Sequence, residues 1–189
     1  MTTVPLISSV TTSGSVALLA LVAALLVAGL GWRLRGSPWL AGGQLVLLLG
    51  VGTIAALREP FASSPTGLQT LAIALSAVLA VGGGGPATTA VFRLVDGPGA
   101  DRTGSMRRAA EVLRGGAWIG VLERTAIFSA VVSGWPEGIA ISLALKGLGR
   151  YPELRNQERT GIAERFLIGT FVSVLWAAGC AGTALLLIG

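Results

Sequence analysis

The stretch VALLALVAALLVAGLGWRLR, residues 16–35, decides the class of fold. It begins with an uninterrupted apolar run, Val16 to Leu30, and ends with Trp32, Arg33 and Arg35. A helix that crosses the hydrocarbon core of a bilayer needs about 17–25 residues of this kind, and aromatic and basic residues mark its boundary with water. No Lys or Arg precedes the run, whereas a secretory signal peptide begins with a positively charged region. We therefore expect a retained first membrane span.

The composition of the whole chain supports the membrane class. Hydrophobic residues make up 52% of the sequence and charged residues 12%, against about 25% charged residues in a soluble domain. The 28 glycines suit helices that pack closely within a bilayer. We expect an all-α, polytopic integral membrane bundle, with residues 1–189 forming a single transmembrane domain.

Six spans are predicted, at residues 15–31, 39–57, 67–83, 116–133, 136–150 and 166–188. The fifth is short for a full crossing. Gly82–Gly85 and Pro86 are expected to kink or stop the third span, because proline removes a helical hydrogen bond. Residues 87–95 either continue that span or lie at the interface. An amphipathic segment at residues 103–115 is expected in the cytoplasmic headgroup plane.

The distribution of Lys and Arg predicts an orientation. The five gaps between spans hold two, one, five, none and five such residues when Arg93 and Lys146 are included. Basic residues accumulate on the cytoplasmic side of membrane proteins, so both termini are expected outside. Lys146 is the single lysine among 14 basic residues, and such an arginine-rich composition is associated with GC-rich bacteria. We expect a multi-pass protein of a bacterial inner membrane.

Glu123, Arg124 and Lys146 are the first candidate site. Glu123 lies 12 residues before Trp135, where the chain reverses, and Lys146 lies 11 residues after it. At about 1.5 Å per helical residue, both lie roughly 16–18 Å below the outer surface, near mid-membrane. A lone charge at that depth costs at least ~2.5–3.5 kcal/mol, so we predict a Glu123–Lys146 salt bridge. Arg124 points about 100° away from Glu123 and needs its own partner, such as water or a lipid phosphate.

Two interpretations of this group are open. It is either a structural clamp that fixes the register of two helices, or a site for a substrate, ion or proton, for which ionisable residues inside membranes are the usual candidates. A third possibility is that the span boundaries are misplaced and the side chains extend to the interface. Glu137 is a further candidate: its position at a helix start is explained by the helix dipole, and the functional alternative is a gate or an external cation site.

A cluster of basic residues is expected on the cytoplasmic side: Arg150, Arg155, Arg159 and Arg165. Arginine binds phosphate through its planar fork, so this cluster could hold anionic lipid headgroups or a lipid-linked phosphate. Acidic residues are interleaved with the arginines between positions 153 and 164, which favours a solvated helix face whose charges pair with one another.

Several classes of site are excluded or disfavoured. The chain has no histidine and one cysteine, Cys180, so an intramolecular disulfide, a Cys/His zinc site and a histidine-dependent triad are impossible. We predict no metal and no cofactor. The high pI is explained by the positive-inside rule, and no nucleic-acid partner is expected. Gly82–Gly85 lack the Lys-Ser/Thr of a phosphate-binding loop.

The carboxyl half carries a series of spaced motifs: Trp118-Ile119-Gly120, Glu123-Arg124, Glu137-Gly138-Ile139, Lys146, Arg150, Glu153-Leu154, and Glu164 followed by Leu167-Ile168-Gly169-Thr170. Over residues 116–175 the chain resembles a family of small uncharacterised bacterial membrane proteins with no established activity. The resemblance implies that these charges act as one unit, and it implies no reaction. Residues 1–95 are not covered by it.

The expected function is that of a small membrane transporter or channel-like protein with a mid-membrane charged site at Glu123, Arg124 and Lys146. One alternative is a structural or accessory subunit of a membrane complex. Another is a membrane enzyme or binding protein for a lipid-linked phosphate, with Glu123 or Glu164 as acid or base. An enzyme is disfavoured because no nucleophile arrangement or metal-ligand cluster is recognisable. The expected partners are the lipid bilayer, anionic lipid headgroups, and a second copy or other subunits, because six spans make a small transporter.

Overall fold

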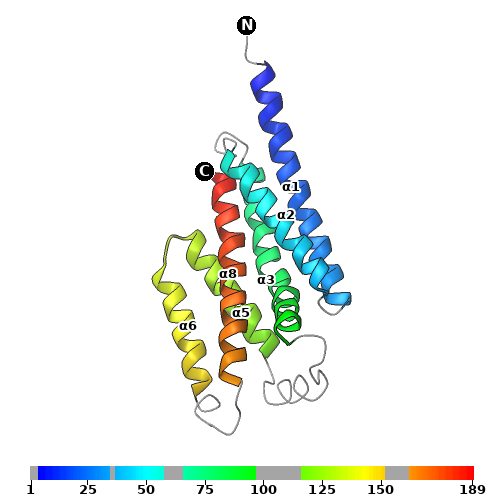
Figure 1. The fold of residues 1–189 in the computed structure, drawn as a ribbon. Helices are drawn as coiled ribbons and strands as arrows, with labels where there is room; N and C mark the ends of the chain where they lie inside the picture. The colour runs from blue at the N-terminus through cyan, green and yellow to red at the C-terminus, as the bar shows by residue number, and fades with distance from the viewer. Residues whose placement is uncertain (1–3, 35–36, 58–65, 97–115, 152–161) are drawn as a thin grey trace.

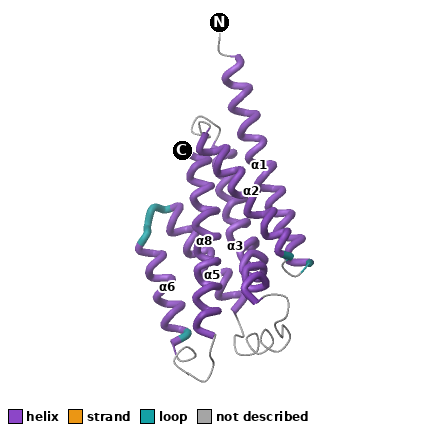
Figure 2. The backbone as a smooth tube through the Cα atoms, viewed as in Figure 1, coloured by secondary structure: helices purple, strands orange, loops and turns teal. Residues whose placement is uncertain are grey.

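The computed structural model describes residues 4–34, 37–57, 66–96, 116–151 and 162–189. The described residues form an all-α bundle (Figures 1 and 2), as the sequence predicts. Its helices are α1 (Val4–Arg33), α2 (Pro38–Leu57), α3 (Thr66–Asp96), α5 (Gly116–Val132), α6 (Glu137–Gly149) and α8 (Ile162–Ile188). The predicted amphipathic segment at residues 103–115 lies outside the described residues.

Four of these helices are long and apolar enough to cross a membrane, over Gly14–Arg33, Pro38–Leu57, Thr66–Val95 and Ala163–Ile188. Helices α5 and α6 are shorter, with 17 and 13 residues. Large apolar side chains cover much of the outer surface, among them Leu19, Leu26, Leu49, Trp118 and Leu175. A surface of this kind matches lipid rather than water, which supports the membrane class.

Successive helices run in opposite directions (Figure 1). The C-terminal ends of α1, α3 and α6 therefore lie at the same end of the bundle as the N-terminal ends of α2, α5 and α8. The arginines near these helix ends, Arg33, Arg93, Arg150 and Arg165, define what we call the arginine end. This alternation is what the predicted topology requires, and the orientation in a membrane stays a prediction.

Helices α3 and α8 form the centre of the bundle. Helix α3 packs along α8 and also contacts α1, α2 and α5, whereas α6 packs mainly against α5 at the edge. Many buried core residues are small: Ala17, Ala24, Ala72, Ala177, Ala181 and Ala184. Small residues allow helix backbones to approach closely, which is how helices associate within a bilayer.

Helix α3 does not stop at its glycines. It continues through Gly82–Gly85 and Pro86 to Asp96, so the expected stop near residue 83 is wrong and residues 87–95 belong to the helix. Pro86 has no N–H, which leaves the carbonyl of Gly82 without its helical donor. The indole Nε1 of Trp32 donates to that carbonyl at 2.7 Å. A side chain from α1 therefore replaces the lost hydrogen bond and lets the helix continue.

Candidate functional site

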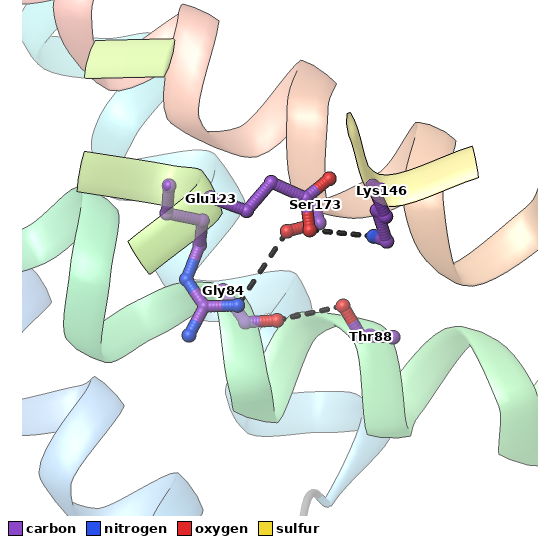
Figure 3. Close-up of polar contacts among 6 residues, drawn as sticks. Gly84, Thr88, Glu123, Lys146 and Ser173 are labelled. Carbon is purple, nitrogen blue, oxygen red and sulfur yellow. Dashed lines mark hydrogen bonds and ion pairs between the residues drawn. The ribbon is translucent and has the colours of Figure 1, made fainter. Parts of the chain in front are cut away.

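Glu123 and Lys146 form a salt bridge between α5 and α6. Lys146 Nζ lies 2.5 Å from Glu123 Oε2, and the side chains are 16% and 3% exposed respectively (Figure 3). The sequence predicted this pair from the equal distance of the two residues from Trp135. The coordinates confirm the contact and place Glu123 among other helices rather than against lipid.

The turn between α5 and α6 fixes the register of this pair. Gly134 adopts φ 66°, a conformation that favours glycine, and the N–H of Trp135 donates to the carbonyl of Ala130 at 2.8 Å. Gly138 lies against Trp135 and Ala130, and a Cβ at this position would come within 2.7 Å of the Trp135 ring. The two helices therefore start close together, which brings side chains at matching distances from the turn into contact.

Lys146 also contacts the central helix α8. Its Nζ lies 5.6 Å from the centre of the Phe166 ring, within the range of a cation–π interaction. Lys146 is three residues before Gly149, the last residue of α6. The ammonium group therefore lies where α5, α6 and α8 meet and is partly exposed.

The Glu123 carboxylate is only half used by this pair. Its Oε2 accepts from Lys146, whereas Oε1 is buried and has no hydrogen-bond partner among the described residues. Buried polar atoms normally have a partner. Oε1 of Glu123 can therefore accept a further hydrogen bond inside the bundle.

Arg124, the middle residue of α5, points to a different set of partners. The residue is 6% exposed, its Nε donates to the carbonyl of Val81 at 3.0 Å, and its Nη1 donates to Ser173 Oγ at 3.5 Å. These partners come from α3 and α8, and neither carries charge. Among the described residues no carboxylate lies within ion-pair distance of Arg124.

Glycines make the room for this arginine. A Cβ at Gly84 would lie 2.8 Å from Arg124 Nε, and a Cβ at Gly120 would lie 3.1 Å from Nη1. The glycine run, predicted to kink or stop the helix, accepts side chains from other helices: Gly83 faces Gln44 and Trp176, and Gly85 faces Trp32. Glycine costs about 1 kcal/mol relative to alanine inside a helix, and here it permits close approach to the α3 backbone.

Polar residues that the sequence analysis did not select complete the surroundings. Trp176 Nε1 donates to the carbonyl of Leu79 at 3.1 Å, two residues before the carbonyl that accepts from Arg124. Gln44, Ser76 and Thr170 each have a buried side-chain atom without a hydrogen-bond partner among the described residues. The signal that could have found them is the polar residue within an apolar span, since a polar group in a membrane needs an internal partner.

The remaining candidates lie apart from this group. Glu137 is exposed in the first turn of α6, nine residues from Lys146, which is about 13 Å along the helix. Arg150 and Arg165 lie at the arginine end, where the Arg165 guanidinium is 5.8 Å from the Phe92 ring. Arg155 and Arg159 lie outside the described residues. The structure thus brings together Glu123 and Lys146, with Arg124 beside them.

The described residues contain no group of three His, Cys, Asp or Glu side chains that could hold a metal ion. Cys180 is buried and is not in a disulfide. The ion pair of Glu123 with Lys146 joins α5 and α6. The chemistry of the site is therefore that of charged and hydrogen-bonding side chains within an apolar bundle.

Comparisons with known proteins add no identity to this geometry. The chain matches no protein-family model, no curated protein and no solved structure. The resemblance over residues 116–175 consequently assigns no activity, and the function has to be inferred from the buried charges.

Proposed function

We propose that this chain is a small transporter or channel-like protein of a bacterial inner membrane, in which Glu123, Arg124 and Lys146 form the site for the substrate or ion. The proposal rests on the hydrogen-bonding and charged groups of this buried site that the protein itself leaves without a matching partner. Glu123 keeps one oxygen without a partner, and Arg124 has neutral partners only among the described residues. Charges inside a membrane are costly and usually mark the path of an ion or substrate.

A charged group with a purely structural role would be expected to have more of its donors and acceptors satisfied. Burying a charge costs free energy, which is recovered only when the remaining donors and acceptors are also satisfied. Here one buried carboxylate oxygen has no partner, and the hydrogen bonds of Arg124 within the described residues use two of its five N–H groups. This excess supports a ligand that approaches the group during function.

The route to the site leads from the arginine end. Lys146 is three residues from the end of α6, which is about 5 Å along the helix axis, and its side chain is 16% exposed. With six spans and both termini outside, the arginine end is cytoplasmic. A ligand would then reach the site from the cytoplasmic side.

The test is ion flux in liposomes that contain the purified full chain. Liposomes loaded with sodium chloride and a pH-sensitive dye are diluted into salt-free buffer, and the release of sodium, chloride and protons is recorded. Glu123→Gln should abolish the flux that the wild type supports. Glu137→Gln removes the same charge from the exposed end of α6 and should leave the flux unchanged. Equal flux in the wild type and Glu123→Gln would remove Glu123 from the mechanism.

An accessory subunit is the second candidate, and one observation favours it. Helix α6 packs mainly against α5, and its apolar residues Ile141, Leu145 and Leu148 are exposed. Another subunit of a membrane complex could cover this face. In that case the wild-type chain supports no flux by itself, and replacing Ile141 and Leu145 by alanine lowers the yield of the purified complex. The lipid-linked phosphate alternative has no comparable support among the described residues.

A further inference from the structure

We infer that the Arg124 guanidinium, lying between Gly84 and Gly120 and beside Ser173, is a binding site for a small monovalent anion. The inference deepens the proposed function, on which it rests for the transport step, because it names the class of ion carried. Binding itself does not depend on transport.

The charge balance of the buried group is positive. Lys146 is paired with Glu123 by direct contact, so these two charges offset each other. Arg124 is always charged in proteins, and no described carboxylate lies within ion-pair distance of it. A single bound anion would therefore neutralise the group, and a neutral group is far less costly in a medium of low dielectric constant.

Arg124 also has donors to spare. A guanidinium carries five N–H bonds, and the hydrogen bonds within the described residues use one on Nε and one on Nη1. The contact with Ser173 is 3.5 Å long, at the limit for a hydrogen bond. The remaining N–H bonds lie on the Nη1 and Nη2 edge, which is the edge that binds anions in a planar fork. The Ser173 hydroxyl can donate as well as accept.

The residues around that edge have small side chains or none. A Cβ at Gly120 would lie 3.1 Å from Nη1 and 3.8 Å from Nη2, so the guanidinium lies directly against the Gly120 backbone and only glycine fits there. Gly84 holds the other part of the side chain, where a Cβ would lie 2.8 Å from Nε. The α3 backbone thus fixes the Nε side of Arg124, and the terminal nitrogens face small neighbours.

The depth of Arg124 favours a free ion over a lipid headgroup. It is eight residues from both Gly116 and Val132, the ends of α5, which is about 12 Å along the axis in either direction. The neighbouring carboxylate of Glu123 would repel an anion, and Lys146 offsets that repulsion. Lys146 is therefore expected to act as a positioning residue that keeps the site attractive to anions through its pair with Glu123.

The experiment measures bromide binding to the purified full chain in nanodiscs made of neutral lipid. Sodium bromide is titrated by calorimetry against sodium gluconate, the salt of a bulkier monovalent anion, at constant ionic strength. Arg124→Gln should abolish bromide binding, and Arg33→Gln, which removes the same charge at the arginine end, should retain it. Lys146→Met should weaken binding about tenfold, because Glu123 is then an unpaired negative charge next to the site.

A second variant keeps the inference testable if Arg124→Gln does not fold. Gly120→Ala places a methyl group against Nη1 and Nη2 and favours helix formation, so the chain should fold while bromide binding weakens about tenfold. Gly147→Ala is the matched control, since a Cβ there meets nothing within 4 Å. Bromide affinity equal to that of the wild type in Gly120→Ala, or no bromide binding by the wild type, would overturn the inference.

The two proposals fail in different ways. Bromide binding that depends on Arg124, without any flux in liposomes, would reject the transport function and leave the anion site standing. Cation or proton flux that depends on Glu123, without bromide binding, would reject the anion site and leave transport standing.

Discussion

Helix α3 receives polar side chains from two sides, and the two sides differ in what they leave unused. On the α1 side, Trp32 donates to the carbonyl of Gly82, a neutral contact that uses the single N–H of the indole. On the α5 side, Arg124 donates to the carbonyl of Val81, one residue earlier, and keeps a positive charge and further N–H bonds. Both contacts use the same turn of the same helix.

The two contacts differ in role: the Trp32 bond completes the hydrogen bonding of α3, whereas Arg124 keeps groups that can bind a ligand. The Trp32 bond satisfies a carbonyl that Pro86 has deprived of its donor, so donor and acceptor are both fully used. The Val81 carbonyl has its ordinary helical donor at residue 85, so the Arg124 bond is an addition. Trp32 is neutral and its donor is used, so it needs no ligand. Arg124 is charged and has further N–H donors, so a ligand would satisfy it.

Removing one member of the Glu123–Lys146 pair should cost the most. Glu123→Gln leaves the Lys146 ammonium without its counter-ion inside the bundle, and breaking a buried ion pair costs about 3–5 kcal/mol. Because Lys146 is 16% exposed, we expect a loss near the lower limit, about 3 kcal/mol. The free energy of unfolding, measured in mixed detergent micelles, reports this loss.

The double variant Glu123→Gln with Lys146→Met is the control for charge. It removes both charges and keeps side chains of similar length, so it should recover most of the stability that either single variant loses. A double variant no more stable than the two single variants would show that the pair contributes nothing beyond packing.

Crowding the glycine run should have the next largest effect. Gly83→Ala places a Cβ against Nε2 of the buried Gln44 and 2.7 Å from the Trp176 ring, whose indole is already held by the carbonyl of Leu79. Overpacking of this kind costs about 1–3 kcal/mol. Gly82→Ala is the matched change, because a Cβ there meets nothing within 4 Å, and it should stabilise the helix by up to about 1 kcal/mol.

Thermal unfolding of the two alanine variants measures the contrast. Opposite signs are expected although the two positions are adjacent in one helix. If both variants were equally destabilised, the glycines would be required for the backbone conformation of α3 rather than for the close approach of side chains.

Much of the fold follows from the boundaries of apolar runs. The predicted spans 39–57 and 116–133 agree to within one residue at each end with α2 (Pro38–Leu57) and α5 (Gly116–Val132). Prolines and charged residues at the helix ends make such limits visible, because both disfavour continuation into a bilayer. The salt bridge was equally visible, since a tight turn fixes the register of two antiparallel helices, and Glu123 and Lys146 lie 12 and 11 residues from Trp135.

The contacts of α3 were not visible in the sequence. A proline after four glycines predicts a break, and the prediction fails because the missing donor comes from Trp32, 50 residues away along the chain. The partners of Arg124 depend on how α3 and α8 are rotated about their axes. Apolar helices with several similar faces carry no periodic signal that sets this rotation. The sequence therefore does not predict which backbone carbonyls of α3 accept hydrogen bonds from Trp32 and Arg124.

The smallest expected effect concerns the contact between Trp32 and Gly82. Trp32→Phe keeps an aromatic ring against Gly85 and removes the indole N–H, so the carbonyl of Gly82 loses its replacement donor. We expect a loss of about 1 kcal/mol in the free energy of unfolding.

Pro86→Ala supplies a backbone N–H four residues after Gly82, which can restore the helical hydrogen bond. In that background Trp32→Phe should cost close to nothing, and this non-additivity in a double-mutant cycle is the measurement that decides. An equal cost of Trp32→Phe with and without Pro86 would mean that Trp32 stabilises the bundle through its ring alone. The Trp32 indole would then not replace the helical hydrogen bond of Gly82, and the comparison between the Trp32 and Arg124 contacts would no longer hold.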